Sequence, residues 1–165
     1  MDKVVVLGVG NILMQDEGFG VRVVEELARR YTFPDNVEIL DGGTLGMELL
    51  RFITGATRLL IIDAVNGGGS AGDFYHFANE EVKTYFKHKV SMHEIGIQDV
   101  LTAIELVGQP IQEVVVLGVQ PAVIDVGLEL SEAVKPCTFK VVNKTLEVLR
   151  SWGYKPLAAD IGITK

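Results

Sequence analysis

The chain has 165 residues, of which 48% are hydrophobic, and this is enough for one domain with a substantial apolar core. With 15 Lys and Arg against 22 Asp and Glu, its formal net charge is -7, so it is poorly suited to bind a polyanion such as nucleic acid. Cys137 is the only cysteine, which excludes an intrachain disulfide and a zinc site built on several cysteines, and it suits a reducing compartment.

The N-terminal segment carries no pattern of an export signal or a membrane span. Its apolar run covers residues 4–7 and ends at Gly8, which is too short for either. We therefore expect a cytoplasmic protein.

Short apolar runs alternate with segments of helical periodicity along the chain, a pattern typical of βαβ units. The predicted strands cover residues 4–9, 37–40, 58–63, 73–77 and 114–119. Most are continuously apolar, as strands buried on both faces are, whereas residues 73–77 alternate and are expected at an edge. The predicted helices cover residues 17–31, 45–53, 97–107 and 131–152.

The predicted fold class is α/β: a three-layer αβα sandwich around a mostly parallel, doubly wound sheet with one antiparallel edge strand. A single domain is expected over residues 1–155, with residues 156–165 as a tail that is expected to be flexible.

Two carboxylates and one imidazole follow the predicted strands. Glu17 comes after the first strand at the start of its helix, Asp63 ends the strand at 58–63, and His93 lies in a loop before the next helix. In an open parallel sheet, ligand sites form at the carboxyl ends of the strands, so all three are predicted at one edge. An O, O, N donor set suits zinc or nickel and leaves positions open for water or substrate.

Each of these residues also has an ordinary structural interpretation. Glu17 could be a charge in the first turn of a helix, Asp63 a strand-end cap, and His93 an exposed loop residue. Taken singly, these interpretations are favoured. The shared sheet edge is what favours a metal site.

The first glycine turn resembles the start of a dinucleotide-binding loop. Gly8 and Gly10 follow a strand, but Leu13 stands where the third glycine of that pattern belongs, and the helix begins too late for a pyrophosphate. A nucleotide-binding domain is therefore the weaker alternative. We instead expect the glycines to form a tight turn that lets the backbone pass close to a bound peptide.

Four segments together resemble the hydrogenase maturation endopeptidases. They are GVGNILMQDEGFGV at residues 8–21, LDGGTLGMELL at 40–50, Asp63 with Ala64, and SMHEIG at 91–96. The resemblance extends from about residue 3 to residue 152.

The resemblance implies an endopeptidase that removes a C-terminal extension from the precursor of the large subunit of a [NiFe] hydrogenase once nickel has been inserted. It assigns the metal-binding and catalytic residues to Glu17, Asp63 and His93, and recognition of the precursor to Asp41, Gly42 and Gly43. Nickel would be supplied by the substrate, while other divalent ions such as zinc or cadmium could occupy the site. Neither a small-molecule cofactor nor a membrane partner is implied.

Several alternatives stay open at this point. A nickel-binding accessory protein without catalytic activity would use the same three ligands. Asp16 could assist as a general base or cap the first helix. His76 and His88 are weaker candidates for chemistry, and Cys137, in a predicted helix, is expected to be a buried and inert thiol.

Overall fold

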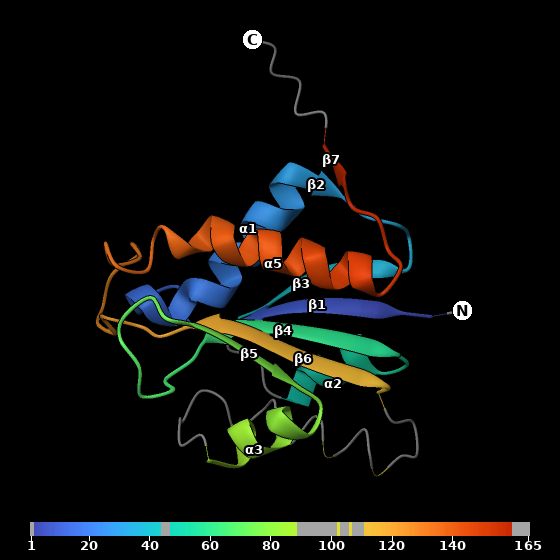
Figure 1. Cartoon of the computed structure of the whole chain (residues 1–165), viewed down its shortest axis with the longest axis horizontal. Coiled ribbons are helices and arrows are strands. Elements are labelled where there is room, and N and C mark those ends of the chain that lie inside the picture. Colours follow the sequence, from blue (N-terminus) through green and yellow to red (C-terminus); the bar gives the residue numbers. More distant parts are fainter. Residues whose placement is uncertain (1, 44–46, 89–101, 103–105, 107–110, 160–165) are drawn as a thin grey trace.

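The computed structural model describes residues 2–43, 47–88, 102, 106 and 111–159, and five of its strands form one sheet (Figure 1). In sheet order these are β3 (Val37–Gly43), β1 (Val4–Val9), β4 (Arg58–Ala64), β6 (Glu113–Val119) and β5 (Phe74–Ala78). All neighbouring pairs are parallel except β5 with β6. The predicted mostly parallel sheet with one antiparallel edge strand is confirmed.

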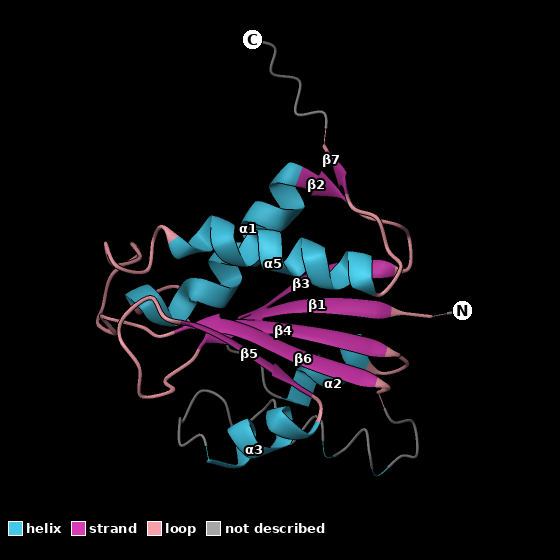
Figure 2. Cartoon of the chain, viewed as in Figure 1, coloured by secondary structure: helices cyan, strands magenta, loops and turns pink. Residues whose placement is uncertain are grey.

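Helices cover both faces of this sheet, as Figure 2 shows. On one face lie α1 (Phe19–Arg30) and α5 (Cys137–Ser151). The other face carries the 3-10 helix η2 (Met47–Leu49), α2 (Leu50–Ile53) and α3 (Glu80–His88). The three-layer αβα architecture is therefore present.

The central strands divide their side chains between two hydrophobic cores. In β1, Val4 and Val6 belong to the core under α1 and α5, whereas Val5 and Leu7 belong to the core on the opposite face. Successive residues of a strand point to opposite faces, so burying both faces requires a continuous apolar run. This requirement is why the strands were recognisable in the sequence.

The starts of α1 and α5 differ from the prediction. α1 begins at Phe19 because the residues before it form the separate 3-10 helix η1 (Gln15–Gly18). α5 begins after Pro136, and Gly153, with a positive φ of 96°, follows its C-terminal end, as is common where helices stop. The helix predicted over 97–107 falls outside the described residues except for 102 and 106, which are helical.

Two features had no counterpart in the prediction. β2 (Tyr31–Thr32) pairs antiparallel with β7 (Leu157–Ala158), which ties the start of the C-terminal tail to the end of α1. Strands of two residues carry no periodicity that a sequence could reveal.

The helix α3 is also absent from the prediction. Val82 is the only fully buried residue of α3 among those with described side chains, so the helix shows no apolar stripe.

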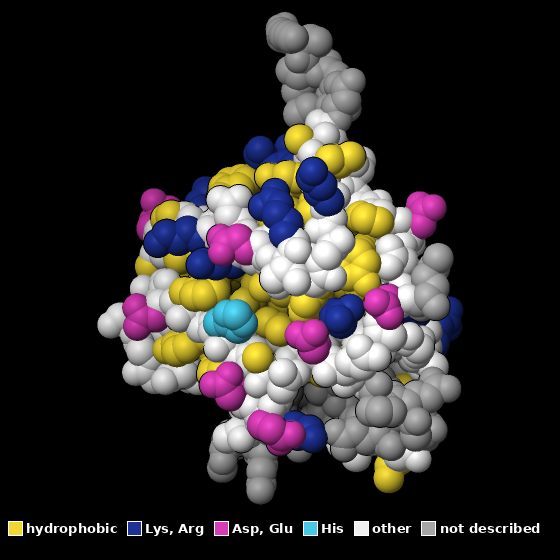
Figure 3. All heavy atoms as spheres, turned by 45° about the vertical axis from the view of Figure 1, so that its right-hand side comes forward, with side chains coloured by type: hydrophobic (Ala, Val, Ile, Leu, Met, Phe, Trp, Pro, Cys, Tyr) yellow, Lys and Arg dark blue, Asp and Glu magenta, His cyan; other side chains and the backbone are white. Residues whose placement is uncertain are grey.

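The surface carries charges of both signs together with exposed hydrophobic atoms, as one face of the molecule shows in Figure 3. None of the described helices combines the length and apolar character that a bilayer span requires.

Candidate metal and substrate site

The carboxyl ends of β1, β3, β4 and β6 share one edge of the sheet, since all four strands run in parallel. β1 lies between β3 and β4 in the sheet. The next strand of this sheet along the chain, β3, is therefore added on one side of β1, and the strand after it, β4, is added on the other side. Such a switch point is where open α/β sheets bind their ligands.

Glu17 lies on η1, directly above this edge. Gly10 has a φ of 128° and no Cβ, which lets η1 pack directly against the backbone of Gly10. A Cβ at this position would lie 1.9 Å from the Glu17 carbonyl oxygen. The side-chain Oε1 of Glu17 is buried and accepts no hydrogen bond from any described residue. A buried carboxylate oxygen without a partner is costly, so this atom is well placed to bind a cation.

Asp63 is the penultimate residue of β4 and is fully buried, rather than emerging at the rim as the sequence suggested. Its Oδ1 accepts a hydrogen bond of 2.8 Å from the backbone N–H of Ala64. η1 contacts β4, and the backbone of Gly20 packs so tightly on β4 that an added Cβ would lie 2.0 Å from the Ile62 carbonyl oxygen. The segments carrying Glu17 and Asp63 are thus held side by side.

His93 lies outside the described residues. Among the described residues, no group of three His, Cys, Asp or Glu side chains could hold a metal ion. Of the three predicted ligands, the structure describes the two carboxylates, which are hard oxygen donors of the kind that a divalent cation prefers.

The predicted recognition residues form the carboxyl end of β3. The N–H of Gly10 donates to the Gly43 carbonyl (2.9 Å), and Gly42 is buried against the Leu7 side chain. Asp41 is exposed. Asp41 and Gly43 line a pocket of about 310 Å³ together with Val21 of α1 and with four residues of the first loop, namely Gly10, Asn11, Ile12 and Leu13.

The two glycines of the first turn have a structural purpose within the fold. A Cβ at Gly8 would lie 2.4 Å from the Gly20 carbonyl oxygen, and one at Gly10 would strike Glu17. Both glycines therefore make room for η1 and α1. Because α1 begins only at Phe19, no helix N-terminus lies at these glycines, as a dinucleotide-binding loop would need.

Asp16 has a role that the sequence did not reveal. It is fully buried and accepts hydrogen bonds from the backbone N–H groups of Ala122, Val123 and Ser131 and from the Ser131 hydroxyl, all between 2.8 and 2.9 Å. Burial raises the pKa of Asp16, but these hydrogen bonds outweigh it and hold the pKa below 3.8. Met14 is the N-cap of η1 and Gly18 is the N-cap of α1, so the alternative that Asp16 caps the first helix is wrong.

Gln120 fixes a second loop at the same edge. Its Oε1 accepts hydrogen bonds from the N–H groups of Gly67 and Gly69 and from the Tyr75 hydroxyl, and its Nε2 donates to Asn66. These contacts define the glycine-rich loop that follows β4. Gln120 directly follows the buried strand β6, and this position is the only feature of the sequence that indicates a role for Gln120 at the sheet edge.

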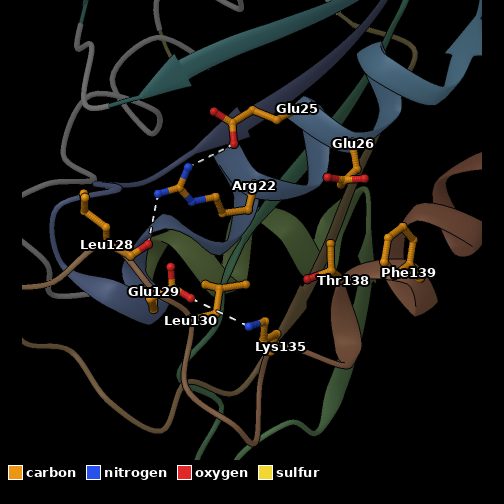
Figure 4. Close-up of a pocket in the computed structure, with 9 residues that line it drawn as sticks. All are labelled: Arg22, Glu25, Glu26, Leu128, Glu129, Leu130, Lys135, Thr138 and Phe139. Carbon is orange, nitrogen blue, oxygen red and sulfur yellow. Dashed lines mark hydrogen bonds and ion pairs between the residues drawn. The ribbon is translucent and has the colours of Figure 1, made fainter. Parts of the chain in front are cut away.

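A larger pocket, of about 460 Å³, lies between α1, α5 and the loop that joins β6 to α5 (Figure 4). Arg22 donates to the Leu128 carbonyl (3.0 Å) and pairs with Glu25, while Lys135 pairs with Glu129 across the pocket mouth. Its lining residues are Arg22, Glu25, Glu26, Leu128, Glu129, Leu130, Lys135, Thr138 and Phe139.

Cys137 is buried at the start of α5, where its thiol contacts the carbonyl oxygens of Gly72 and Ala133. Burial raises the pKa of Cys137. A thiol in this state is a poor nucleophile, which agrees with the expectation that it is inert.

Comparison with known proteins gives a consistent result. A family model described as hydrogenase maturation protease matches residues 21–148. The hydrogenase 2 maturation protease of Escherichia coli is 39% identical over 159 residues, covering 96% of this chain and 97% of that protein. The hydrogenase expression/formation protein HupD of Bradyrhizobium diazoefficiens is 40% identical over 154 residues, covering 92% of this chain and 80% of that protein.

Solved structures agree with these relatives. The hydrogenase maturating endopeptidase HybD from Escherichia coli superimposes with a TM-score of 0.91 at 38% identity, covering 94% of this chain and 97% of that one. The [NiFe] hydrogenase maturation protease HybD from Thermococcus kodakarensis gives a TM-score of 0.74 at 29% identity, covering 88% and 98%. These names favour a peptidase over a non-catalytic accessory protein. The chain belongs to the hydrogenase maturation protease family and is an endopeptidase.

Proposed function

We propose that this endopeptidase removes the C-terminal extension of the large-subunit precursor of a [NiFe] hydrogenase, and that it recognises nickel already bound to that precursor. The observation that carries the proposal is the buried Oε1 of Glu17, which has no hydrogen-bond partner among the described residues. Such an atom is satisfied when a cation arrives. Asp63, on the strand that η1 contacts, would supply the second carboxylate.

The donor chemistry fits nickel. Two carboxylates and the imidazole of His93 would provide three ligands and leave further positions for groups of the precursor and for water. When bound, nickel supplies a Lewis acid that polarises the scissile carbonyl group and a water molecule. Zinc and cadmium satisfy the same donors and are expected to compete for the site.

The chain's own residues then act by holding the precursor. Glu17 and Asp63 bind its metal from two elements whose spacing is fixed by the glycine contacts, so the cleavage site arrives in a defined position. Asp63 is fully buried and its carboxylate is oriented by the N–H of Ala64. Asp16 is not the general base in this proposal, because its carboxylate is occupied by four hydrogen bonds.

Asp41, Gly42 and Gly43 would recognise the precursor beside this site. The pocket that Asp41 and Gly43 line also contains Gly10, whose backbone packs against that of Glu17. A segment of the precursor in this pocket would therefore lie next to the metal. We assign the reaction to the cytoplasm, in keeping with a chain whose one cysteine is reduced and buried.

The test is cleavage of purified precursor, with and without nickel, followed on denaturing gels. We expect the chain to shorten only the nickel-loaded precursor. Glu17→Gln, Asp63→Asn and His93→Ala should each lower the rate by roughly 100-fold or more. His76→Ala is the matched histidine control, because His76 is exposed on the edge strand β5. Cleavage of the nickel-free precursor at the same rate would refute a role for nickel.

A further inference from the structure

An exposed apolar surface borders the proposed cleavage site. Two loops contribute large hydrophobic side chains that face water, among them Val126 at 82% and Leu128 at 59% exposure. We call this surface the rim patch, and it consists of Leu13, Val123, Ile124, Val126 and Leu128. Exposed apolar groups gathered in one place are typical of protein interaction sites.

The two loops of the rim patch are joined to each other by backbone hydrogen bonds. The N–H of Gly127 donates to the Leu13 carbonyl (2.9 Å), and the N–H of Gln15 donates back to the Gly127 carbonyl (3.0 Å). The N–H of Asp16 donates to the Val123 carbonyl (3.1 Å). The apolar side chains are therefore presented by ordered backbone and not by a loop free to fold them inward.

Buried Asp16 holds the second loop of the rim patch in place through hydrogen bonds. Its carboxylate binds the backbone of Ala122 and Val123 at one end of the second loop and Ser131 at the other. Asp16 also precedes Glu17 within η1. The same short helix thus positions both the proposed metal ligand and the rim patch.

The rim patch continues into both pockets at this part of the molecule. Leu13 also lines the pocket that contains Asp41, and Leu128 lines the larger pocket shown in Figure 4. A protein segment could lie over this surface from one pocket to the other while its cleavage site is held beside Glu17. Exposed Asp125 lies between Ile124 and Val126 in the chain, and exposed Asp41 lines the same pocket as Leu13. These two carboxylates favour basic side chains at the margin of the partner.

We propose that the rim patch is the docking surface for the hydrogenase large-subunit precursor, which covers it with an apolar segment bordered by basic residues. This inference rests on the proposed function for the identity of the substrate. It adds a binding surface outside the metal site, and its variants should weaken binding of the precursor more than they slow the bond-breaking step.

The experiment compares the wild-type chain with Ile124→Ser/Val126→Ser and with Leu13→Ser, which alters the other loop. Leu157→Ser is the matched control, because Leu157 is 60% exposed but lies in β7, away from the rim patch. Serine removes apolar surface without adding charge. The dissociation constant for nickel-loaded precursor is measured by biolayer interferometry, and KM and kcat are measured by gel.

We expect the double variant to raise the dissociation constant and KM by about tenfold or more, which corresponds to about 1.4 kcal/mol of binding free energy, with a smaller effect on kcat. Leu13→Ser should raise both constants as well, and Leu157→Ser should change neither. An unchanged dissociation constant in both rim variants, with unaltered melting temperatures, would overturn the docking surface. So would a lower kcat with unchanged binding.

Binding and cleavage are measured separately so that the two proposals can fail independently. A wild-type chain that binds the precursor through the rim patch without cutting it would contradict the proposed function alone. A wild-type chain that cuts the precursor, with rim variants that bind it equally well, would contradict the docking surface alone.

Discussion

Asp16 and Glu17 are adjacent carboxylates in opposite situations. Asp16 accepts four hydrogen bonds, whereas Oε1 of Glu17 accepts none from the described residues although it is buried. One carboxylate is thus committed to the structure and the other is available to a ligand. The sequence could not distinguish them, because the partners of Asp16 lie more than a hundred residues further along the chain.

Removing the charge at Glu17 should not destabilise the metal-free protein. Glu17→Gln replaces a buried anionic oxygen with a neutral group that costs less to bury, so the free energy of unfolding without metal should stay the same or rise by up to about 1 kcal/mol. Urea denaturation measures this, and Glu25→Gln, on exposed α1 surface, is the control. A loss of several kcal/mol would mean that Glu17 has a structural partner instead.

Asp16→Asn should destabilise the fold, by roughly 2 kcal/mol at neutral pH, because an amide cannot accept all the hydrogen bonds of the carboxylate. The folded-state pKa lies below 3.8, so the carboxylate contributes stability above that pH and loses it as the pH falls through the folded-state pKa. The difference in unfolding free energy between wild type and variant should therefore shrink on acidification below 3.8. Urea titrations across this range test it, with exposed Asp35→Asn as control. A difference independent of pH would contradict the argument.

At the scale of elements, the packing of α1 on the sheet decides the geometry of the site. The stripe of apolar residues predicted this helix, and the continuous apolar runs predicted β1, β4 and β6. Neither pattern predicts η1, whose position depends on the close contact of Gly10 with Glu17 and on the packing of Gly20 in α1 against Ile62 and Val9. Shared location at the carboxyl edge was predictable for Glu17 and Asp63, but the burial of Asp63 was not.

Gly20→Ala tests this packing directly. A methyl group there would lie 2.0 Å from the Ile62 carbonyl oxygen and 2.6 Å from that of Val9, so α1 must move away from both strands. We expect a loss of roughly 3 kcal/mol in unfolding free energy and a lower rate of precursor cleavage in the folded fraction. Glu25→Ala, in the same helix but exposed, should change the unfolding free energy little. Wild-type stability in Gly20→Ala would show that the helix tolerates displacement.

At the scale of the whole molecule, the described part of the C-terminal tail, residues 156–159, makes few contacts with the domain. β7 pairs with β2 over two residues, and both of its side chains are exposed. Truncation after Pro156 should therefore lower the free energy of unfolding by no more than about 1 kcal/mol and leave precursor cleavage intact. Chemical denaturation and the gel assay measure the two effects. Loss of folding would place the tail within the domain, contrary to the expected boundary at residue 155.

The single cysteine allows local opening at the start of α5 to be measured in the unmodified chain. The Cys137 thiol is buried beside Gly72 and Ala133, and the sequence contains no other cysteine to compete for a reagent. A thiol reagent can therefore react only when α5 separates from the loop that precedes β5. The labelling rate of Cys137 would measure how often α5 opens under native conditions, and a slower rate on addition of the precursor would show that substrate binding stabilises the start of α5.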